Sequence, residues 1–237
     1  MSDVRLFLAK TKVVIRRHYP KFLFFILGNL ATLVIIGSMI ELQHTNTAMP
    51  YRKGAITIKW LPPTVTHYSQ AIERQANKYN IDAQFVAIIM TLESGGYTKA
   101  DSGVAKGLMQ VTDPTGTDIA KMYLKKPVRS YDLFDPQTSI EFGVAYIAHL
   151  RDTLCDYTDG PSWDSCAEVI AAGYNGGPGA AIELIKGNGI QANETLIYSR
   201  NAFNMWREKS ASKSPTFDRW QAAGGQRLID AAKKEQK

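Results

Sequence analysis

The sequence contains little cysteine and little histidine. Among 237 residues there are two cysteines and four histidines. Two sulfur ligands without a cluster of histidines do not complete a zinc site, so we expect neither a metal nor another cofactor. Cys155 and Cys166 are separated by ten residues, in a segment rich in Asp, Gly, Pro and Trp. In an oxidising compartment such a pair usually forms a disulfide, and two free thiols are the alternative.

The sequence also lacks an alternation of polar and apolar residues after residue 64, and it has no visible internal repeat. Instead, apolar residues recur at spacings of three and four, which is typical of helices. We therefore expect a mainly α domain. The expected helices cover residues 66–79, 83–94, a stretch from 113, a stretch from 135, and residues 165–174, 180–185 and 195–207.

Negative charge is almost absent from the first 21 residues, which contain one acid, Asp3. The six basic residues there are Arg5, Lys10, Lys12, Arg16, Arg17 and Lys21. This tail therefore carries +5 of the total charge of +6, which leaves +1 for the rest of the chain. A basic patch beside an apolar run indicates membrane topology rather than nucleic-acid binding. We expect no nucleic-acid partner.

Charge is absent altogether from residues 22–40. A helix of this length rises about 28 Å, close to the ~30 Å of a bilayer's hydrocarbon core. We expect a transmembrane anchor, with the basic tail in the cytoplasm and everything after residue 41 on the other side. A cleaved signal peptide is the alternative, although its apolar part is shorter, about 7–15 residues. No cysteine lies near the run to carry a lipid.

These features predict the organisation of the whole chain. The expected segments are a basic tail (1–21), an anchor (22–40), a linker (41–64), a catalytic domain (65–209) and a C-terminal tail (210–237). The linker is rich in polar and turn residues. The C-terminal tail mixes apolar and charged residues, so it packs as an extra helix, contacts a partner or stays in solvent.

The main candidate for chemistry is Glu93. It ends the almost wholly apolar stretch 83–94, which is typical of a buried helix. Burial and the negative end of a helix dipole both raise a carboxyl pKa, and a carboxyl group that is protonated near neutral pH can act as a general acid. Taken alone, the residue also fits an ordinary surface glutamate. Nearby glycines would let the backbone approach a ligand: Gly95, Gly96, Gly107, Gly176 and Gly177.

Three motifs surround this glutamate in the sequence: Glu93-Ser94-Gly95, Gly107-Leu108-Met109-Gln110 and Gly173-Tyr174-Asn175-Gly176-Gly177-Pro178. In this order and spacing they resemble the soluble lytic transglycosylase (SLT) family. The helix from Asp135 is similar to the family's connecting segment, and Glu194-Thr195 with Tyr198 is similar to its last motif. The resemblance covers about residues 65–207. Gly173, Gly176 and Ser139 depart from the residues that the family often has there.

The resemblance implies a lysozyme-like α domain, as in goose-type lysozyme, and a non-hydrolytic cut of peptidoglycan strands. Glu93 would protonate the β-1,4 oxygen between N-acetylmuramic acid and N-acetylglucosamine. It would then take the proton of the muramic C6 hydroxyl, which closes on C1 to give a 1,6-anhydro end. Because the substrate supplies the nucleophile, one carboxylate suffices where most glycosidases need two.

The resemblance also assigns roles around Glu93. Five residues would line the cleft or hold the glycan: Ser94, Met109, Gln110, Tyr174 and Asn175. Tyr198 would hydrogen-bond Glu93 and orient it. With the predicted anchor, the expected location is the bacterial inner membrane, with a single span and the catalytic domain in the periplasm.

Two other functions stay open from the sequence. A goose-type hydrolase would need a second carboxylate to activate water, for which Asp101 is the nearest acid after Glu93; a solvated turn residue is the other interpretation of Asp101. A non-catalytic peptidoglycan-binding subunit of an envelope-spanning secretion or conjugation machine is the second alternative. Such a machine is also a candidate partner of an active enzyme.

Overall fold

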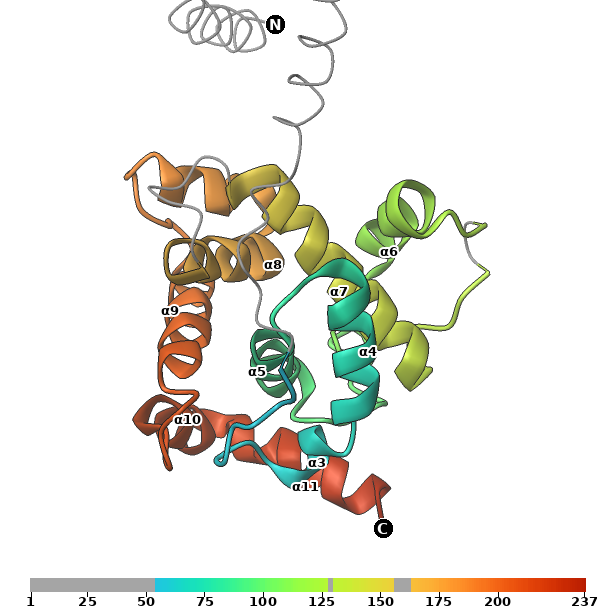
Figure 1. The fold of residues 1–237 in the computed structure, drawn as a ribbon, viewed down its shortest axis with the longest axis vertical. Helices are drawn as coiled ribbons and strands as arrows, with labels where there is room; N and C mark the ends of the chain where they lie inside the picture. Colours follow the sequence, from blue (N-terminus) through green and yellow to red (C-terminus); the bar gives the residue numbers. More distant parts are fainter. Residues whose placement is uncertain (1–53, 128–129, 156–162) are drawn as a thin grey trace, which may run out of the picture. The chain divides into compact units, whose positions relative to one another are not determined.

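The computed structural model describes residues 54–127, 130–155 and 163–237. All of these residues belong to one compact unit, which begins at Ala48 and ends at Lys237. The predicted basic tail and anchor, residues 1–40, lie outside the described residues. Within the described ranges, no helix is both long and apolar enough to cross a membrane. This compact unit is mainly helical, as predicted (Figure 1).

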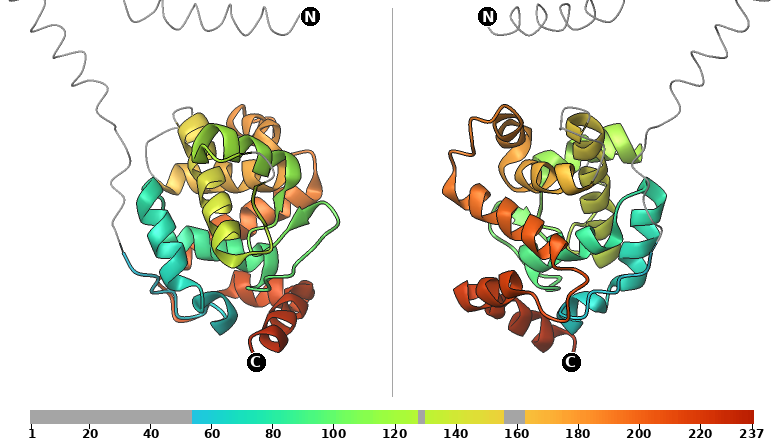
Figure 2. Two further views of the ribbon diagram at one scale, coloured as in Figure 1. Left: turned by 90° about the vertical axis from the view of Figure 1, so that its right-hand side faces the viewer. Right: turned by 60° about the vertical axis from the view of Figure 1, so that its left-hand side comes forward.

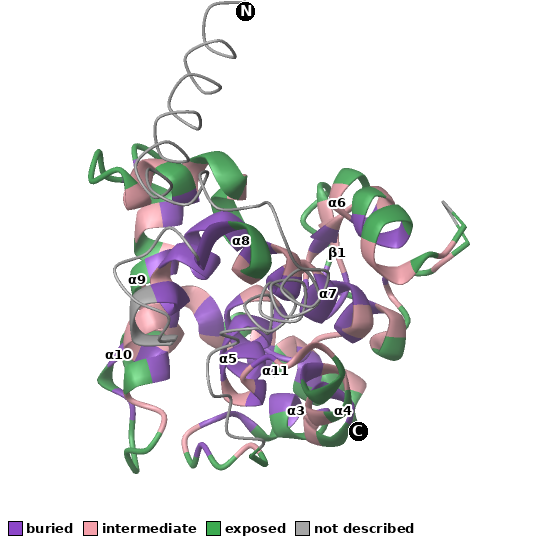
Figure 3. Ribbon diagram, turned by 45° about the horizontal axis from the view of Figure 1, so that its top comes forward, coloured by how far each residue is buried: buried purple, intermediate pink, exposed green. Residues whose placement is uncertain are grey.

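The helix that carries Glu93, α5 (Ala83–Ser94), is the most buried element of this unit. Ten of its twelve residues are buried, and it lies near the middle in Figure 3. The described helices around it are α3 (Pro63–Thr66), α4 (Ser69–Tyr79), α6 (Asp113–Ile119), α7 (Pro136–Leu154), α8 (Trp163–Ile185), α9 (Asn193–Arg207), α10 (Pro215–Trp220) and α11 (Gln226–Glu235). Helix α5 contacts α3, α4 and α9, while α8 contacts α7 and α9. Neighbouring helices thus cover the apolar surface of α5.

Local capping residues set where the helices begin. The Asp82 side chain accepts a hydrogen bond from the Gln84 backbone N–H at 2.9 Å, which caps the start of α5. Asp135 accepts one from Thr138 N at 2.8 Å at the start of α7. Helix α5 ends where Gly95 adopts a left-handed conformation, with φ of 59°. The predicted bounds of this helix, 83–94, are confirmed.

Two local features differ from the predicted elements. The helices expected at 165–174 and 180–185 form one element, α8, interrupted by the non-helical Gly177 (φ 77°, ψ 168°) just before Pro178. A short antiparallel ladder also pairs β1 (Ala105–Lys106) with β2 (Val111–Thr112). Strands of two residues are too short to show an alternating pattern in the sequence.

Residues 54–64 and 210–237, which the sequence placed outside the catalytic domain, both pack against it. Ile58 is 5% exposed, and the Trp60 indole N–H donates to the Glu208 carbonyl at 3.1 Å. The Trp60 ring also lies 5.4 Å from the ring of Phe217 in α10. Further along, Ile229 of α11 is 2% exposed, and α11 lies beside α3 (Figure 2). The folded unit therefore includes both flanking segments.

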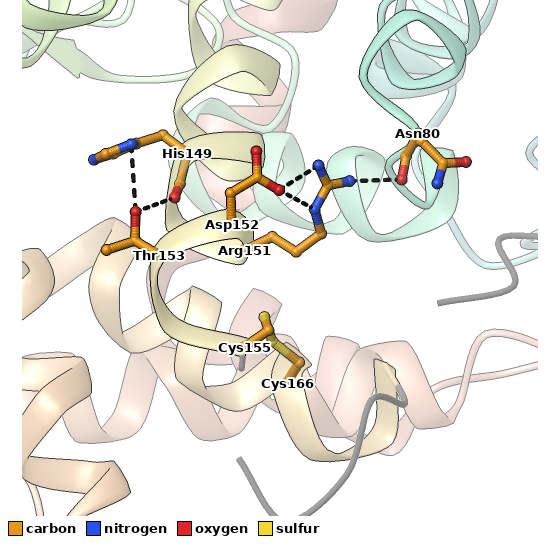
Figure 4. The surroundings of a disulfide bond; sticks show 7 residues. All are labelled: Asn80, His149, Arg151, Asp152, Thr153, Cys155 and Cys166. Atoms are coloured by element: carbon orange, nitrogen blue, oxygen red, sulfur yellow. Dashed lines mark hydrogen bonds and ion pairs between the residues drawn. A yellow bond between two sulfur atoms is a disulfide. The ribbon is translucent and has the colours of Figure 1, made fainter. Parts of the chain in front are cut away.

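A disulfide joins Cys155, at the C-terminal end of α7, to Cys166 in α8 (Figure 4). The Cα atoms of the two residues are 5.6 Å apart. One turn earlier, the Arg151 guanidinium donates to the backbone carbonyls of Tyr79 and Asn80, each at 2.8 Å. These hydrogen bonds tie α7 to the end of α4, and the disulfide ties it to α8.

We expect removal of this disulfide to lower stability without abolishing the fold. A cross-link between residues 11 apart in sequence restricts the unfolded chain, an effect of about 3 kcal/mol. The double variant Cys155→Ala, Cys166→Ala should therefore lose roughly 5–10 °C in unfolding midpoint, measured by circular dichroism. Reductant should lower the wild-type midpoint and leave the double variant unchanged. Peptide mapping that found two free thiols in exported protein would contradict the pairing.

Candidate active site

The site forms where the C-terminal turn of α5 meets α9. Glu93 lies on that turn, and the Tyr198 hydroxyl donates a hydrogen bond of 2.5 Å to Glu93 Oε1. The two residues are 105 positions apart in the sequence, and the packing of α9 on α5 brings them together. The hydrogen bond expected from the resemblance is thus present in the structure.

The protein surroundings make Glu93 a weak acid. Burial, which disfavours the charged form, raises the pKa of its carboxyl group from an ordinary 4.5 to about 8. The hydrogen bond from Tyr198 acts in the opposite direction because it stabilises the carboxylate, and the negative charge of Glu194 adds to the rise. Near neutral pH the group is therefore largely protonated and able to donate a proton.

Two tyrosine hydroxyls near Glu93 stay protonated at any physiological pH. Burial and the charge of Glu93 raise the pKa of both Tyr174 and Tyr198 well above the ordinary value. The Tyr174 hydroxyl donates to the Met109 carbonyl at 2.7 Å, and its ring lies 5.2 Å from the ring of Tyr146. Tyr174 thus uses its hydroxyl to hold the 107–110 motif, whereas Tyr198 uses its own to hold Glu93.

Ser94 and Met109 are both fully buried in this structure, and both make contacts within the protein. Their expected part in lining the cleft stays a prediction. The Ser94 hydroxyl donates to the Leu108 carbonyl at 2.8 Å. The Met109 side chain packs on Gly143, where an added Cβ would lie 2.6 Å from Met109 Cβ. Ser94 thus links the 107–110 motif to α5, and Met109 packs the same motif against α7.

The other two residues assigned to glycan binding keep some exposure. Gln110 is partly buried, and its Nε2 donates to the carbonyls of Ala100 at 2.9 Å and Gly107 at 3.1 Å. Asn175 is exposed, and its Oδ1 accepts a hydrogen bond of 2.8 Å from the Thr195 hydroxyl. Asn175 is therefore the most exposed member of the expected binding set.

The motif glycines make room for protein rather than for a ligand. A Cβ on Gly107 would lie 1.9 Å from the Leu133 carbonyl oxygen, and one on Gly96 would lie 2.4 Å from that of Thr64. No real Cβ tolerates such distances, so a larger residue would displace the backbone. Of the five glycines singled out in the sequence, only Gly177 has nothing within 4 Å of the added Cβ.

Two supporting residues were not identified as part of the site from the sequence. The Ser139 hydroxyl, on α7, accepts a hydrogen bond of 3.1 Å from the Met109 backbone N–H. The Tyr146 hydroxyl donates to the Gly173 carbonyl at 3.1 Å. In the sequence, Ser139 stands out only as a departure from the family's residues, and Tyr146 lies within the helix that resembles the family's connecting segment. No local pattern shows which backbone atom such side chains contact.

The Asp101 side chain is bonded within the turn formed by residues 101–103. It is exposed, and its Oδ1 accepts a hydrogen bond of 2.7 Å from the Gly103 backbone N–H. This geometry fits the interpretation as a solvated turn residue. Glu194, also exposed, is the acid whose charge acts on Glu93.

The raised pKa of Glu93 predicts a pH-dependent stability. The folded protein binds this proton up to about pH 8, whereas the unfolded chain releases it near its ordinary pKa. The stabilisation linked to protonated Glu93 is therefore complete at low pH and disappears as the pH rises towards 8. Glu93→Gln, which cannot ionise, should be more stable than the wild type at pH 8.5, by about 2–4 kcal/mol. Thermal unfolding from pH 4.5 to 9 checks this, and parallel curves for the two proteins would contradict it.

Comparison with known proteins points to one family. Residues 70–197 match the transglycosylase SLT domain. The membrane-bound lytic murein transglycosylase C of Shigella sonnei is 36% identical over 146 residues, which cover 58% of this chain and 40% of that protein. Its counterpart from Serratia proteamaculans is 35% identical over 129 residues, which cover 53% of this chain and 35% of that protein. The chain thus spans less than half the length of these curated relatives.

Solved structures of lytic transglycosylases also match. The chain aligns with an inactive mutant of lytic transglycosylase Slt from Pseudomonas aeruginosa at 19% identity and a TM-score of 0.48, covering 62% of this chain and 25% of that one. The 70 kDa soluble lytic transglycosylase of Escherichia coli aligns at 25% identity and a TM-score of 0.49, covering 63% and 25%. The family match extends over more than half of the 237 residues of this chain. The chain therefore belongs to the transglycosylase SLT domain family.

Proposed function

We propose that the protein is a peptidoglycan lytic transglycosylase. It cleaves the β-1,4 bond between N-acetylmuramic acid and N-acetylglucosamine without water and leaves a 1,6-anhydro end. The observation that carries the proposal is Glu93, whose pKa is about 8 and whose carboxyl oxygen accepts a hydrogen bond from Tyr198 at 2.5 Å. Membership of the family and the names of its relatives support the same reaction.

In this reaction Glu93 acts twice. It first donates its proton to the glycosidic oxygen while the bond from that oxygen to C1 breaks. The resulting carboxylate then takes the proton of the muramic C6 hydroxyl, whose oxygen forms the new bond to C1. Glu93 ends protonated, so the cycle needs no external acid or base.

Tyr198 fits the second half of this cycle. Its hydroxyl stays protonated because its pKa lies well above the ordinary value. A donated hydrogen bond stabilises the carboxylate more than the neutral acid. Tyr198 therefore lowers the energy of the stage at which Glu93 is charged and keeps its Oε1 fixed.

The nature of the cut ends tests the proposal. Sacculi digested by the purified full-length chain should release muropeptides with 1,6-anhydro ends, each lighter by one water than the hydrolytic product, in mass spectrometry. A goose-type hydrolase would give reducing ends only. A non-catalytic binding subunit would release nothing.

We further propose a single span through the inner membrane, with the catalytic domain in the periplasm. The uncharged residues 22–40 and the six basic residues before them support this topology, as does the term membrane-bound in the names of the relatives. A reporter enzyme that is active only in the periplasm, fused after Lys237, should be active. If only a cytoplasmic reporter fused at the same position were active, the proposed topology would be wrong.

A further inference from the structure

The C-terminal helix α11 is attached to the loop that follows Glu93. Residues 226–235 lie beyond the family match, which ends at residue 197. At Gly95 an added Cβ would lie 2.9 Å from the Ile229 backbone nitrogen, so the two backbones touch. Glu235 accepts hydrogen bonds from the backbone N–H, at 3.0 Å, and from the hydroxyl of Thr98. These contacts fix α11 against residues 95–98.

A groove of about 690 Å³ lies between this loop and α11. Residues of both segments line it, among them Tyr97, Lys99, Arg227, Asp230, Lys234 and Glu235. The helix that forms one wall is the red segment beside α3 in Figures 1 and 2. Because α11 is held by backbone contact and by Glu235, the groove is a built feature of the fold.

The acids in the groove are already occupied. Glu235 is bonded to Thr98, and Asp230 accepts a hydrogen bond of 2.8 Å from Gln226 and lies 3.7 Å from Lys233. Among the residues that the structure describes, none of Lys99, Arg227 and Lys234 forms an ion pair. With three cations against two acids, the groove keeps a net positive charge beside the Tyr97 ring, a combination suited to carboxylates.

The groove lies close to Glu93 along the chain. Tyr97 follows Glu93 by four residues, so the two Cα atoms are at most about 14 Å apart. In peptidoglycan a short peptide stem hangs from the lactyl group of the muramic sugar and carries several carboxylates. A four-residue stem also extends up to about 14 Å, so its greatest length matches the largest possible separation between Glu93 and Tyr97.

We propose that this groove binds the carboxylates of the peptide stem carried by the muramic sugar next to the bond that Glu93 cuts. The inference rests on the proposed function, because only muramic sugars carry such stems. It makes α11 a specificity element that favours peptide-bearing strands over naked ones.

Binding measurements on the full chain with Glu93→Gln, which keeps the ligand intact, test this. The two ligands are a soluble glycan fragment with its peptide stems and the same fragment after enzymatic removal of the stems. Arg227→Gln with Lys234→Gln should raise the Kd for the peptide-bearing fragment about tenfold, the loss expected for charge-assisted contacts. The Kd for the naked fragment should change less than about twofold, because these side chains do not touch the glycan.

Matched variants separate the explanations. Lys121→Gln with Lys213→Gln removes the same charge from exposed positions outside the groove and should leave both Kd values unchanged. Exchanging the two cations, Arg227→Lys with Lys234→Arg, keeps both positive charges and should leave the Kd for the peptide-bearing fragment close to that of the unexchanged protein. Equal losses for both fragments, equal losses in the control, or no loss at all would each overturn the proposal. Reducing ends in the wild-type digest would instead refute the transglycosylase, and these Kd comparisons would still report on the groove.

Discussion

Glu93→Gln should remove nearly all cleavage of sacculi while the protein still folds and binds glycan. Glutamine keeps the shape of the side chain and can still accept the hydrogen bond from Tyr198, but it can neither donate nor take up the proton of the reaction. General acid–base catalysis contributes about 10²–10⁴-fold, and Glu93 serves in both steps. We therefore expect a loss of at least about 10⁴-fold in kcat, measured by the release of muropeptides.

Two other acids provide the controls. Asp101→Asn should cost less than about threefold in kcat, because Asp101 bonds within its own turn. Glu194→Gln removes the negative charge that raises the pKa of Glu93, so it should lower that pKa slightly and leave most activity. A hydrolase with two carboxylates would lose activity at Glu93 and, to a similar extent, at one of these two. Near-normal turnover of Glu93→Gln would refute the site itself.

Those features of the site that depend on a short stretch of chain were predictable from the sequence. Asp82 caps α5, and the apolar run behind it ends at Glu93, so the helix and the position of its acid could both be inferred. The mainly α fold follows from the same spacing of apolar residues. The raised pKa of Glu93 was expected because an acid at the end of such a helix is placed against buried neighbours.

Apart from the Tyr198–Glu93 hydrogen bond, which the family resemblance implied, features that depend on contacts between distant segments were not predictable. Whether Ser94 faces a ligand or the core depends on where the Leu108 carbonyl lies, 14 residues later. The burial of Met109 depends on Gly143 of α7. The C-terminal segment left three interpretations open, because its place is set by the approach of Ile229 to Gly95. Each of these contacts is a product of tertiary packing, which the residues themselves do not specify locally.

Tyr198→Phe should lower activity and also shift its pH dependence. A hydrogen bond to a charged group contributes about 1.5–3 kcal/mol, so its loss at the carboxylate stage should reduce kcat by roughly 10–100-fold. The same bond lowers the pKa of Glu93, and its removal should raise that pKa above about 8. Since the first step needs protonated Glu93, kcat falls as the pH rises through this pKa. The alkaline fall should therefore begin at a higher pH in the variant than in the wild type.

A second tyrosine makes the test specific. The Tyr123 hydroxyl also donates to a carboxylate, that of Asp152, at 2.8 Å, but outside the site. Tyr123→Phe removes the same kind of hydrogen bond and should leave the alkaline limb of the kcat profile in place. If the alkaline limb of the kcat profile is unchanged in Tyr198→Phe, or moves to lower pH, the hydroxyl does not act on the ionisation of Glu93. Loss of kcat with a displaced limb assigns Tyr198 to the carboxylate stage, whereas a merely structural role would reduce kcat equally at every pH.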